Sequence, residues 1–179
     1  MVPSDGSRLY SGSFRNGKMI YGRLAPGEEN SGKLVNMVRE KAKQAAEDNN
    51  TGIIILDGPP GIRCPVISTI TGVDVVIIVT EPTVSGLHDL QRAAELVLKS
   101  ERKPRVIINK YDVNSDMSEV INEWCNKNNI PVVANLPFDR KMVDAMVNGK
   151  TITEFDQDNI INKELTRIWK NILNNNENE

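Results

Sequence analysis

The stretch that decides the fold is IIILDGPPG, residues 53–61. Its first four residues, Ile53 to Leu56, form a short apolar run that is rich in β-branched side chains. Such a run is typical of a strand that is buried on both faces, as in a parallel sheet. The loop Asp57-Gly58-Pro59-Pro60-Gly61 follows it directly. We therefore expect a buried strand that ends in a loop rich in glycine and proline.

Working outward, the same pattern recurs along the chain. Three more apolar runs predict strands, at residues 73–80, 106–108 and 130–136. Helical spacing of apolar residues separates or follows them, at residues 84–99, 115–128, 139–147 and 157–173. Upstream, the pattern predicts a strand over 19–24 and a helix over 31–48. Strands that alternate with helices form βαβ units. The predicted fold is therefore α/β, a three-layer, doubly wound and mainly parallel sheet.

The chain has 179 residues, which is enough for one domain with a sizeable core. Residues 1–17 are rich in Ser, Gly and Arg and predict a loose N-terminal arm. We expect a single domain over residues 18–173 and a frayed tail over 174–179.

Charge and cysteine content exclude several classes of protein. The net charge of −2 and the isoelectric point near 5.6 provide no attraction to nucleic acid. Cys64 and Cys125 are too few for a disulfide framework, which favours a reducing cytoplasm. No segment approaches the roughly 18 apolar residues of a membrane span, and the N-terminus has no apolar signal core.

The loop after the first predicted strand has the residue types of a nucleotide-sensing switch. Ligands of open α/β sheets bind beyond the carboxyl ends of the strands. Asp57 there can hold Mg²⁺ through a water molecule and act in catalysis. Gly58 and Gly61 let the backbone approach a γ-phosphate, and Pro59 and Pro60 stiffen the turn. The alternative is a plain turn between a strand and a loop.

A second candidate follows the run at 106–108. Asn109-Lys110-Tyr111-Asp112 resembles the N-K-x-D sequence by which GTPases bind the base. An Asn amide at a strand end can both donate to and accept from a purine edge. The alternative is an Asn that caps a helix and an Asp in a turn. After the last strand, Pro137 could flank a base, whereas Asp139 could simply cap the next helix.

A third string imitates a phosphate-binding loop. Residues 27–33, GEENSGK, match G-x-x-x-x-G-K between a predicted strand and helix. The next residue should be Ser or Thr, whose hydroxyl binds Mg²⁺, but it is Leu34. Glu28 and Glu29 would also place negative charge against the phosphates. We therefore predict that this loop does not bind phosphate.

Two longer strings together resemble one family over about residues 18–155. They are GEENSGKLV at 27–35, and DGPPGIRCPV at 57–66 with its continuation TEPTVSGLHDL at 80–90. Both are similar to the P-loop ATPases of the MinD/ParA superfamily that carry an inserted ferredoxin domain. The sequence resembles the part C-terminal to that insertion. It contains neither the lysine-rich Walker A loop nor the cysteine-rich ferredoxin motifs of the family.

The resemblance implies ATP and Mg²⁺ as ligands, and a 4Fe–4S cluster in the complete family but not in this chain alone. Asp57 and the loop to Gly61 would then serve the phosphate side, and Asn109, Lys110, Asp112 and Pro137 the base side. Cys64 is a weak candidate for an iron–sulfur ligand, and small-residue packing is its alternative role.

The resemblance also predicts a partner. A second chain would supply the P-loop and ferredoxin portion, or two copies would form a homodimer, across an exposed sheet edge. Hydrolysis by this chain alone is not expected, because positive charge on the phosphates is missing. The alternative function is a non-catalytic protein-interaction module that keeps the fold.

Overall fold

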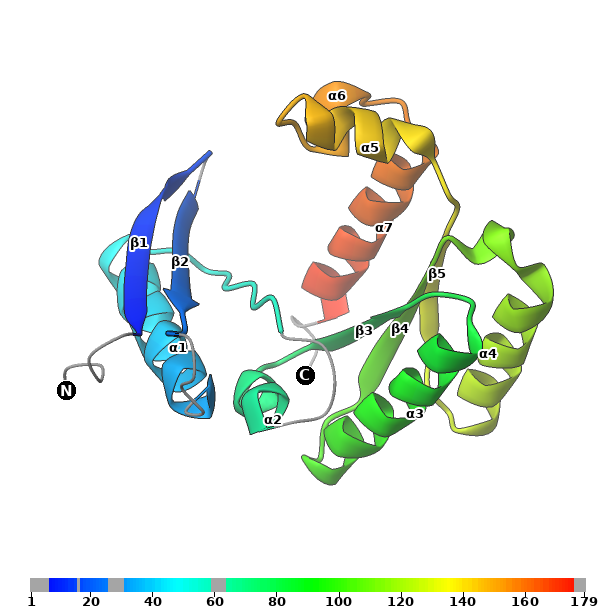
Figure 1. Ribbon diagram of the computed structural model, residues 1–179, viewed down its shortest axis with the longest axis horizontal. Coiled ribbons are helices and arrows are strands. Elements are labelled where there is room, and N and C mark those ends of the chain that lie inside the picture. Colours follow the sequence, from blue (N-terminus) through cyan, green and yellow to red (C-terminus); the bar gives the residue numbers. More distant parts are fainter. Residues whose placement is uncertain (1–6, 16, 26–30, 59–63, 176–179) are drawn as a thin grey trace. The chain divides into compact units, whose positions relative to one another are not determined.

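The computed structural model describes residues 7–15, 17–25, 31–58 and 64–175 (Figure 1). The chain divides into two compact units, residues 1–73 and 74–179. The expectation of one domain over residues 18–173 stays a prediction.

The first unit begins with an antiparallel hairpin. Strand β1 (Arg8–Phe14) pairs with β2 (Gly17–Arg23), and the rings of Tyr10 and Tyr21 stack across the pair at 5.0 Å. The predicted loose arm over 1–17 is therefore wrong for residues 8–14. A cross-strand aromatic pair stabilises a hairpin that the Ser- and Gly-rich composition conceals.

Helix α1 (Ser31–Asp48) packs on β2 and has the predicted bounds. Leu34 is buried, and its side chain lies where a Cβ on Gly22 would be. Leu34 therefore has a packing role between α1 and β2. Helix α2 (Cys64–Ile70), which the sequence did not predict, is tied to α1 because the guanidinium of Arg39 donates to the carbonyls of Ser68 and Thr71.

The predicted strand at Ile53–Leu56 does not form. These residues have no strand or helix assignment, and Ile53, Ile54 and Ile55 are 44%, 43% and 78% exposed. An apolar β-branched run becomes a strand only when a neighbouring strand accepts its hydrogen bonds. No such neighbour is present among the residues that the structure describes in the first unit.

The second unit contains the parallel sheet (Figure 1). Its strands are β3 (Val76–Thr80), β4 (Pro104–Asn109) and β5 (Val132–Leu136), in the order β3-β4-β5. The helices are α3 (Val84–Lys99), α4 (Ser115–Lys127), α5 (Arg140–Val147), α6 (Ile152–Phe155) and α7 (Ile160–Asn175), with a short 3-10 turn η1 (Tyr111–Val113). The three predicted strands and four predicted helices of this half are confirmed, and α6 is an addition.

Two apolar cores lie on the two faces of β4. Val106 and Ile108 are fully buried in one core with residues of α3 and α4. Ile107, between them in the chain, points to the opposite face and packs with Ile161 and Ile168 of α7. Alternate residues of one strand thus serve both cores. The unit is a three-layer α/β/α fold, as the sequence predicts.

The C-terminal tail differs slightly from expectation. Helix α7 continues to Asn175, so Asn174 and Asn175 are helical, and residues 176–179 of the predicted frayed tail lie outside the described part. Across the described ranges, no helix is both long and apolar enough to cross a membrane.

Candidate functional site

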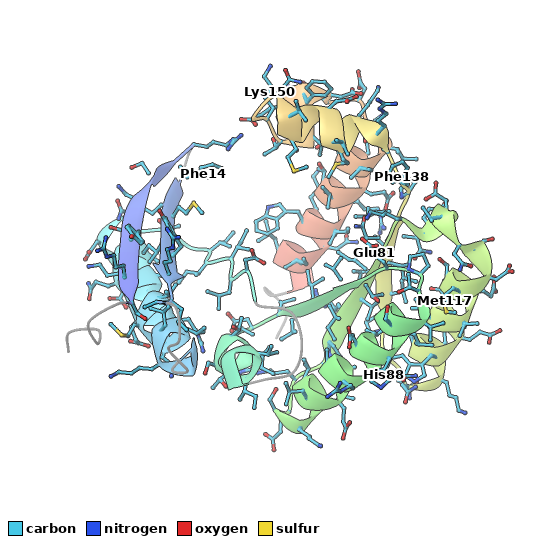
Figure 2. All side chains as sticks on the ribbon, viewed as in Figure 1. Phe14, Glu81, His88, Met117, Phe138 and Lys150 are labelled. Atoms are coloured by element: carbon cyan, nitrogen blue, oxygen red, sulfur yellow. The ribbon has the colours of Figure 1, made fainter. Side chains whose placement is uncertain are left out.

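The carboxyl ends of β3, β4 and β5 lie at one edge of the sheet, where the base-side residues were predicted. Figure 2 shows Glu81 and Phe138 at this end of the second unit. Glu81 follows β3, Asn109 ends β4, and Phe138 lies two residues after β5. The three loops that leave the strands are joined to one another by the contacts that follow.

The loop after β3 is locked to the start of α3. Thr80 is buried and its hydroxyl donates to the carbonyl of Gly86 at 3.0 Å. Thr83 caps the helix, since its hydroxyl accepts from the Gly86 N–H at 2.9 Å. A Cβ on Gly86 would lie 2.3 Å from the carbonyl oxygen of Glu81. Only glycine allows the chain to approach itself this closely.

Lys110 connects the first loop to the second. It adopts the left-handed conformation, with φ of 55°, which costs a non-glycine residue on the order of 1 kcal/mol. Its ammonium group lies 2.8 Å from the carboxylate of Glu81. Both side chains are partly exposed, so this ion pair orients the loops more than it stabilises the fold. Glu81 is a site residue that sequence reasoning missed, although its position directly after a strand is the signal.

Asp112 connects the second loop to the third. Its Oδ1 accepts a hydrogen bond from the backbone N–H of Phe138 at 2.6 Å, across 26 positions of sequence. Pro137, the predicted base-flanking residue, directly precedes this contact and is half-buried. The structure therefore brings Asn109, Lys110, Asp112 and Pro137 together at one edge.

Asp139 has the capping role that was its alternative reading. Its Oδ1 accepts from the N–H of Lys141 at 2.8 Å, and its Oδ2 accepts from the amide of Asn159 at 2.6 Å. The Asn159 hydrogen bond, followed by that of Lys141, lowers the pKa of Asp139. The hydrogen bond from Lys141 also lowers the pKa of Asp156, at 2.6 Å. The third loop is thus fixed to the helices beyond it.

The side chain of Asn109 differs from these neighbours. It is half-buried and makes no hydrogen bond with any residue that the structure describes. Its carboxamide therefore keeps both a donor and an acceptor for a ligand at the sheet edge.

The switch-side candidates belong to the other unit. Asp57 and Gly58 are exposed and follow the unpaired Ile53–Leu56 run. Pro59, Pro60 and Gly61 lie outside the described residues, as does the side chain of Cys64. Within the described ranges, no group of three or more His, Cys, Asp or Glu side chains could hold a metal ion. That Asp57 and Asn109 serve one ligand stays a prediction.

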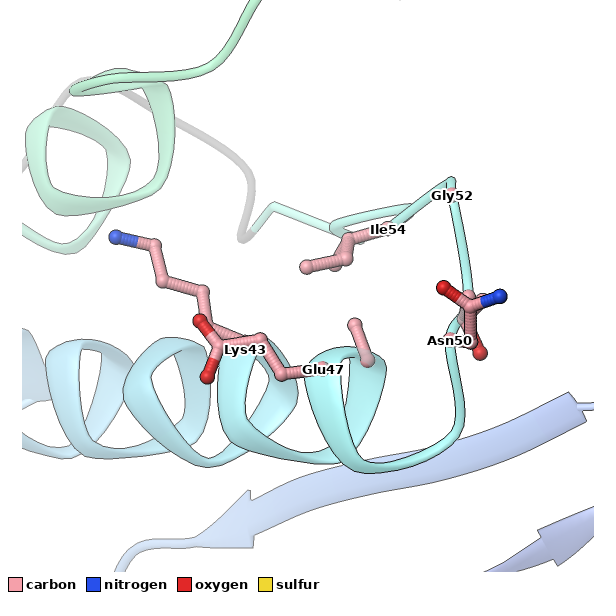
Figure 3. Close-up of a pocket in the computed structure, with 7 residues that line it drawn as sticks. Lys43, Glu47, Asn50, Gly52 and Ile54 are labelled. Carbon is pink, nitrogen blue, oxygen red and sulfur yellow. The ribbon is translucent and has the colours of Figure 1, made fainter.

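A hollow of about 510 Å³ lies in the first unit, between α1 and the segment that follows it (Figure 3). Lys43 and Glu47 line one side and Ile54 the other. It contains none of the predicted site residues, and its exposed lining gives no catalytic grouping. Cys125 is no nucleophile either, because it is buried in the core and burial raises the pKa of its thiol to about 11.

Two solved structures with a similar fold are MinD proteins. The MinD cell division protein of Aquifex aeolicus has a TM-score of 0.63 and 20% identity, over 80% of this chain and 61% of its own. The cell division ATPase MinD of Pyrococcus furiosus has a TM-score of 0.62 and 17% identity, over 80% and 58%. The fold is MinD-like. The doubly wound, P-loop NTPase-like architecture expected from the sequence is thus confirmed.

Three proteins of Methanocaldococcus jannaschii are similar in sequence. One uncharacterized protein is 32% identical over 64% of this chain and 40% of its own length. A second uncharacterized protein is 27% identical over 83% of this chain and 49% of its own length. An uncharacterized ATP-binding protein is 22% identical over 78% of this chain and 54% of its own length. The chain thus spans about half the length of these relatives. No family model matches the sequence.

Proposed function

We propose that this chain forms the base side of an ATP site in a MinD-type ATPase. Asn109 contacts the adenine, Lys110 and Pro137 flank it, and Asp112 completes the edge. Asp57 positions Mg²⁺ through water, and the loop from Gly58 through Pro59 and Pro60 to Gly61 approaches the γ-phosphate.

The observation that carries this proposal is that the Asn109 amide makes no hydrogen bond with any described residue. The polar groups around it are engaged with one another: Lys110 with Glu81, and Asp112 with the Phe138 N–H. A half-buried amide to which no described residue donates or from which none accepts, framed by neighbours that are bonded to one another at the carboxyl edge of a parallel sheet, has the form of a ligand contact. The MinD-like fold and a relative named as ATP-binding support adenine nucleotide as the ligand.

The phosphate side requires a further element. Leu34 replaces the Mg²⁺-binding hydroxyl and is buried against β2, so α1 provides no phosphate grip. We propose that a partner chain, a second copy or a segment outside these 179 residues supplies it. The outer edge of β3 supports such pairing, since β3 pairs only with β4 among the described strands.

The test is a titration with adenosine and with ATP·Mg²⁺, followed by NMR chemical shifts. Both ligands should bind with similar millimolar affinity, because the base supplies the contacts and the phosphates have no grip. Asn109→Ala should weaken both by about tenfold, the loss of a good amide–base contact. Asn126→Ala, an exposed change on α4, is the matched control. Unchanged binding in Asn109→Ala, or no saturable shift at all, would overturn the base site.

Hydrolysis is tested separately. The 179 residues alone should release no phosphate from ATP above the uncatalysed rate, because the sequence contains no working Walker A loop to place positive charge on the β- and γ-phosphates. Turnover by the purified chain that Asp57→Asn abolishes would show that the chain contains its own phosphate site.

A link to iron–sulfur or redox chemistry rests on the resemblance alone and is proposed through Cys64. Iron and sulfide content after anaerobic reconstitution should fall in Cys64→Ser and not in Cys125→Ser. Equal metal content in both variants would remove Cys64 from consideration.

The second candidate function is a non-catalytic interaction module. Helix α5 favours it: Met142, Val143, Met146 and Val147 share one broad stripe of that helix and are 42% to 80% exposed. Polar substitution of Met146 and Val147 that abolishes a protein contact, with adenosine binding unchanged, would favour this function over nucleotide sensing.

A further inference from the structure

The hairpin of the first unit has one face covered by α1 and one face open. A Cβ on Gly22 would meet the side chain of Leu34, so α1 covers the face to which position 22 points. Adjacent residues of a strand point to opposite faces, so Tyr21 points to the open face. Its cross-strand partner Tyr10 shares that face, and the two rings stack at 5.0 Å with an interplanar angle of 15°. The stacked pair therefore forms a flat aromatic surface directed away from α1.

The open face also has positive charge that nothing in the hairpin balances. Arg8 lies directly opposite Arg23 in the register of the hairpin, and both side chains are exposed. Like charges that face each other across a strand pair destabilise the pair. Neither guanidinium has an ion pair or hydrogen bond with a residue that the structure describes. The sequence from Gly6 to Gly27 contains four basic residues and no acidic one. An anion that binds from outside would offset this repulsion.

The remainder of the open face is flat and has a third guanidinium at its other end. Gly12 lies between Tyr10 and Phe14 along β1, and a Cβ there would meet nothing within 4 Å. Phe14 is 51% exposed at the turn end of the hairpin (Figure 2). The guanidinium of Arg15 lies 4.5 Å from the centroid of the Phe14 ring. The strip from Arg8 to Phe14 spans roughly 20 Å at the rise of a strand. Positive charge thus lies at both ends of a strip of exposed rings.

Single-stranded nucleic acid has the chemistry that matches this strip. Its bases stack on aromatic rings whatever their sequence, and its phosphates bind guanidinium groups. The net charge of −2, which predicts no attraction to nucleic acid for the chain as a whole, is an average that conceals the local charge of the hairpin. A polyanion with planar rings therefore fits the open face better than the bulk charge indicates.

An anionic membrane is the competing partner, and the open face suits it less well. A surface that lies in a membrane needs a broad apolar face to bury. The aliphatic side chains of Leu9 and Ile20 are half-buried on the face that α1 covers. On the open face, Phe14 already has the guanidinium of Arg15 over its ring, which opposes burial of that ring in lipid.

We propose that the open face of the hairpin binds single-stranded nucleic acid. The rings on this face stack with the bases, and the guanidinium groups at its two ends bind the phosphates. The residues are Tyr10, Phe14 and Tyr21 for stacking, and Arg8, Arg15 and Arg23 for the phosphates. This binding does not rest on the proposed nucleotide site.

The first experiment measures fluorescence anisotropy of labelled oligothymidylate and oligouridylate, each of about twelve nucleotides, with the full chain. Saturable binding is expected, and the tighter of the two probes identifies DNA or RNA as the partner. Tyr21→Val keeps a residue that favours a strand but removes the ring, and it should weaken binding on the order of tenfold. Tyr21→Phe keeps the ring and should bind within about twofold of wild type. No saturable binding, or equal binding of a duplex of the same length, would overturn the stacking role.

The second experiment tests the phosphate contacts through salt. The logarithm of the binding constant should fall with the logarithm of salt concentration with a slope of about −2, from three guanidinium groups at about −0.7 each. Arg8→Gln should reduce that slope by about 0.7 without lowering the free energy of unfolding, because it removes a repulsion. Arg102→Gln, exposed in the second unit, is the matched control and should leave the slope unchanged. Lower stability in Arg8→Gln with an unchanged slope would mean that Arg8 is structural, and would overturn its role.

Vesicles test the competing partner with the same variants. The chain should not sediment with vesicles of equal parts phosphatidylserine and phosphatidylcholine under the conditions in which it binds the oligonucleotides. Sedimentation that Tyr21→Val and Arg8→Gln both abolish, without oligonucleotide binding, would overturn the proposal and assign the open face to a membrane surface.

Discussion

The runs Ile53–Leu56 and Val106–Ile108 have almost the same residue types but different structures. The second is the centre of β4, fully buried at two of its three positions and paired on both sides. The first is exposed at Ile53, Ile54 and Ile55 and has neither strand nor helix assignment. Each run also precedes a predicted half of the nucleotide site. The half that follows the paired strand is held by a network of hydrogen bonds, whereas Asp57 makes no side-chain hydrogen bond with any described residue.

The difference shows what an apolar β-branched pattern predicts. It identifies a segment that can be a strand, but strand hydrogen bonds need a partner of matching register. β4 has β3 and β5 beside it, with Val79 opposite Ile107 and Ile107 opposite Ala134. No described strand of the first unit pairs with Ile53–Leu56. The variants that follow challenge this contrast between the two regions, from the largest expected effect to the smallest.

The sharpest challenge is one substitution made in both runs. Ile108→Ala should lower the free energy of unfolding by about 2–5 kcal/mol, because it opens a cavity in a fully buried core. Ile54→Ala should cost less than about 1 kcal/mol, since Ile54 is 43% exposed. Urea unfolding followed by far-UV circular dichroism measures both, because helices of the two units contribute to that signal. Equal losses would mean that Ile54 is buried in a packed strand.

Glycines give a second matched pair. Gly86→Ala should lower the free energy of unfolding by about 1–3 kcal/mol, because the new Cβ would lie 2.3 Å from the backbone carbonyl oxygen of Glu81. Gly52→Ala, just before the unpaired run, meets nothing within 4 Å and should be neutral within about 0.5 kcal/mol. The midpoint of urea unfolding distinguishes them. A neutral Gly86→Ala would show that the loop after β3 can relax.

The buried Asn159 tests how firmly the third loop is held. Its Oδ1 accepts from the Ile161 N–H at the start of α7, and its amide donates to Asp139. Asn159→Ala should lower the free energy of unfolding by about 1–2 kcal/mol, because it removes both the cap of α7 and the hydrogen bond to Asp139. Asn171→Ala, exposed on the same helix, provides the control. A loss no larger than that of the control would mean that α7 is fixed by its apolar face alone.

The smallest effect is a pH dependence. The hydrogen bond from Lys141 lowers the pKa of Asp156 below its ordinary value of 3.8. The folded state therefore binds this proton less readily than the unfolded state, so the contribution to stability is present above pH 3.8 and is lost as the pH falls further. Asp156→Asn should be less stable than wild type at neutral pH, and the difference should shrink below pH 3.8. Stability measured from pH 7 to pH 2, with Asp144→Asn as control, tests this. A difference that does not depend on pH would contradict it.

The sequence predicted the second unit well because local signals there agree with tertiary packing. The bounds of α3 follow from Thr83, which caps its first turn, and the strands follow from runs that are buried on both faces. The strand predicted over 19–24 corresponds to β2 (Gly17–Arg23), whereas β1 was missed because its alternation is weak and the main stabilising pair of the hairpin is Tyr10 with Tyr21. Residues 53–56 are apolar and β-branched, as the prediction of a strand requires. Whether they form a strand depends on another segment of the chain that could pair with them, and the local pattern does not contain that information.

Within the candidate site, sequence reasoning found the positions but not all the roles. Asn109, Lys110, Asp112 and Pro137 do gather at one edge, which strand-end placement predicts. That Asp112 binds the Phe138 N–H could not be read from the sequence, because the contact spans 26 positions and depends on the register of β4 against β5. That Lys110 pairs with Glu81 likewise depends on the neighbouring order of β3 and β4.

The strand order β3-β4-β5 has a consequence for how the protein is made. Each strand of the parallel sheet pairs with the strand that follows it in the chain, so each pairing waits only for the crossover helix that separates the two strands. During synthesis, β3 and α3 would leave the ribosome first and wait only for β4, then for β5. The base side of the site can thus be assembled soon after its last helix emerges, before any ligand or partner is met.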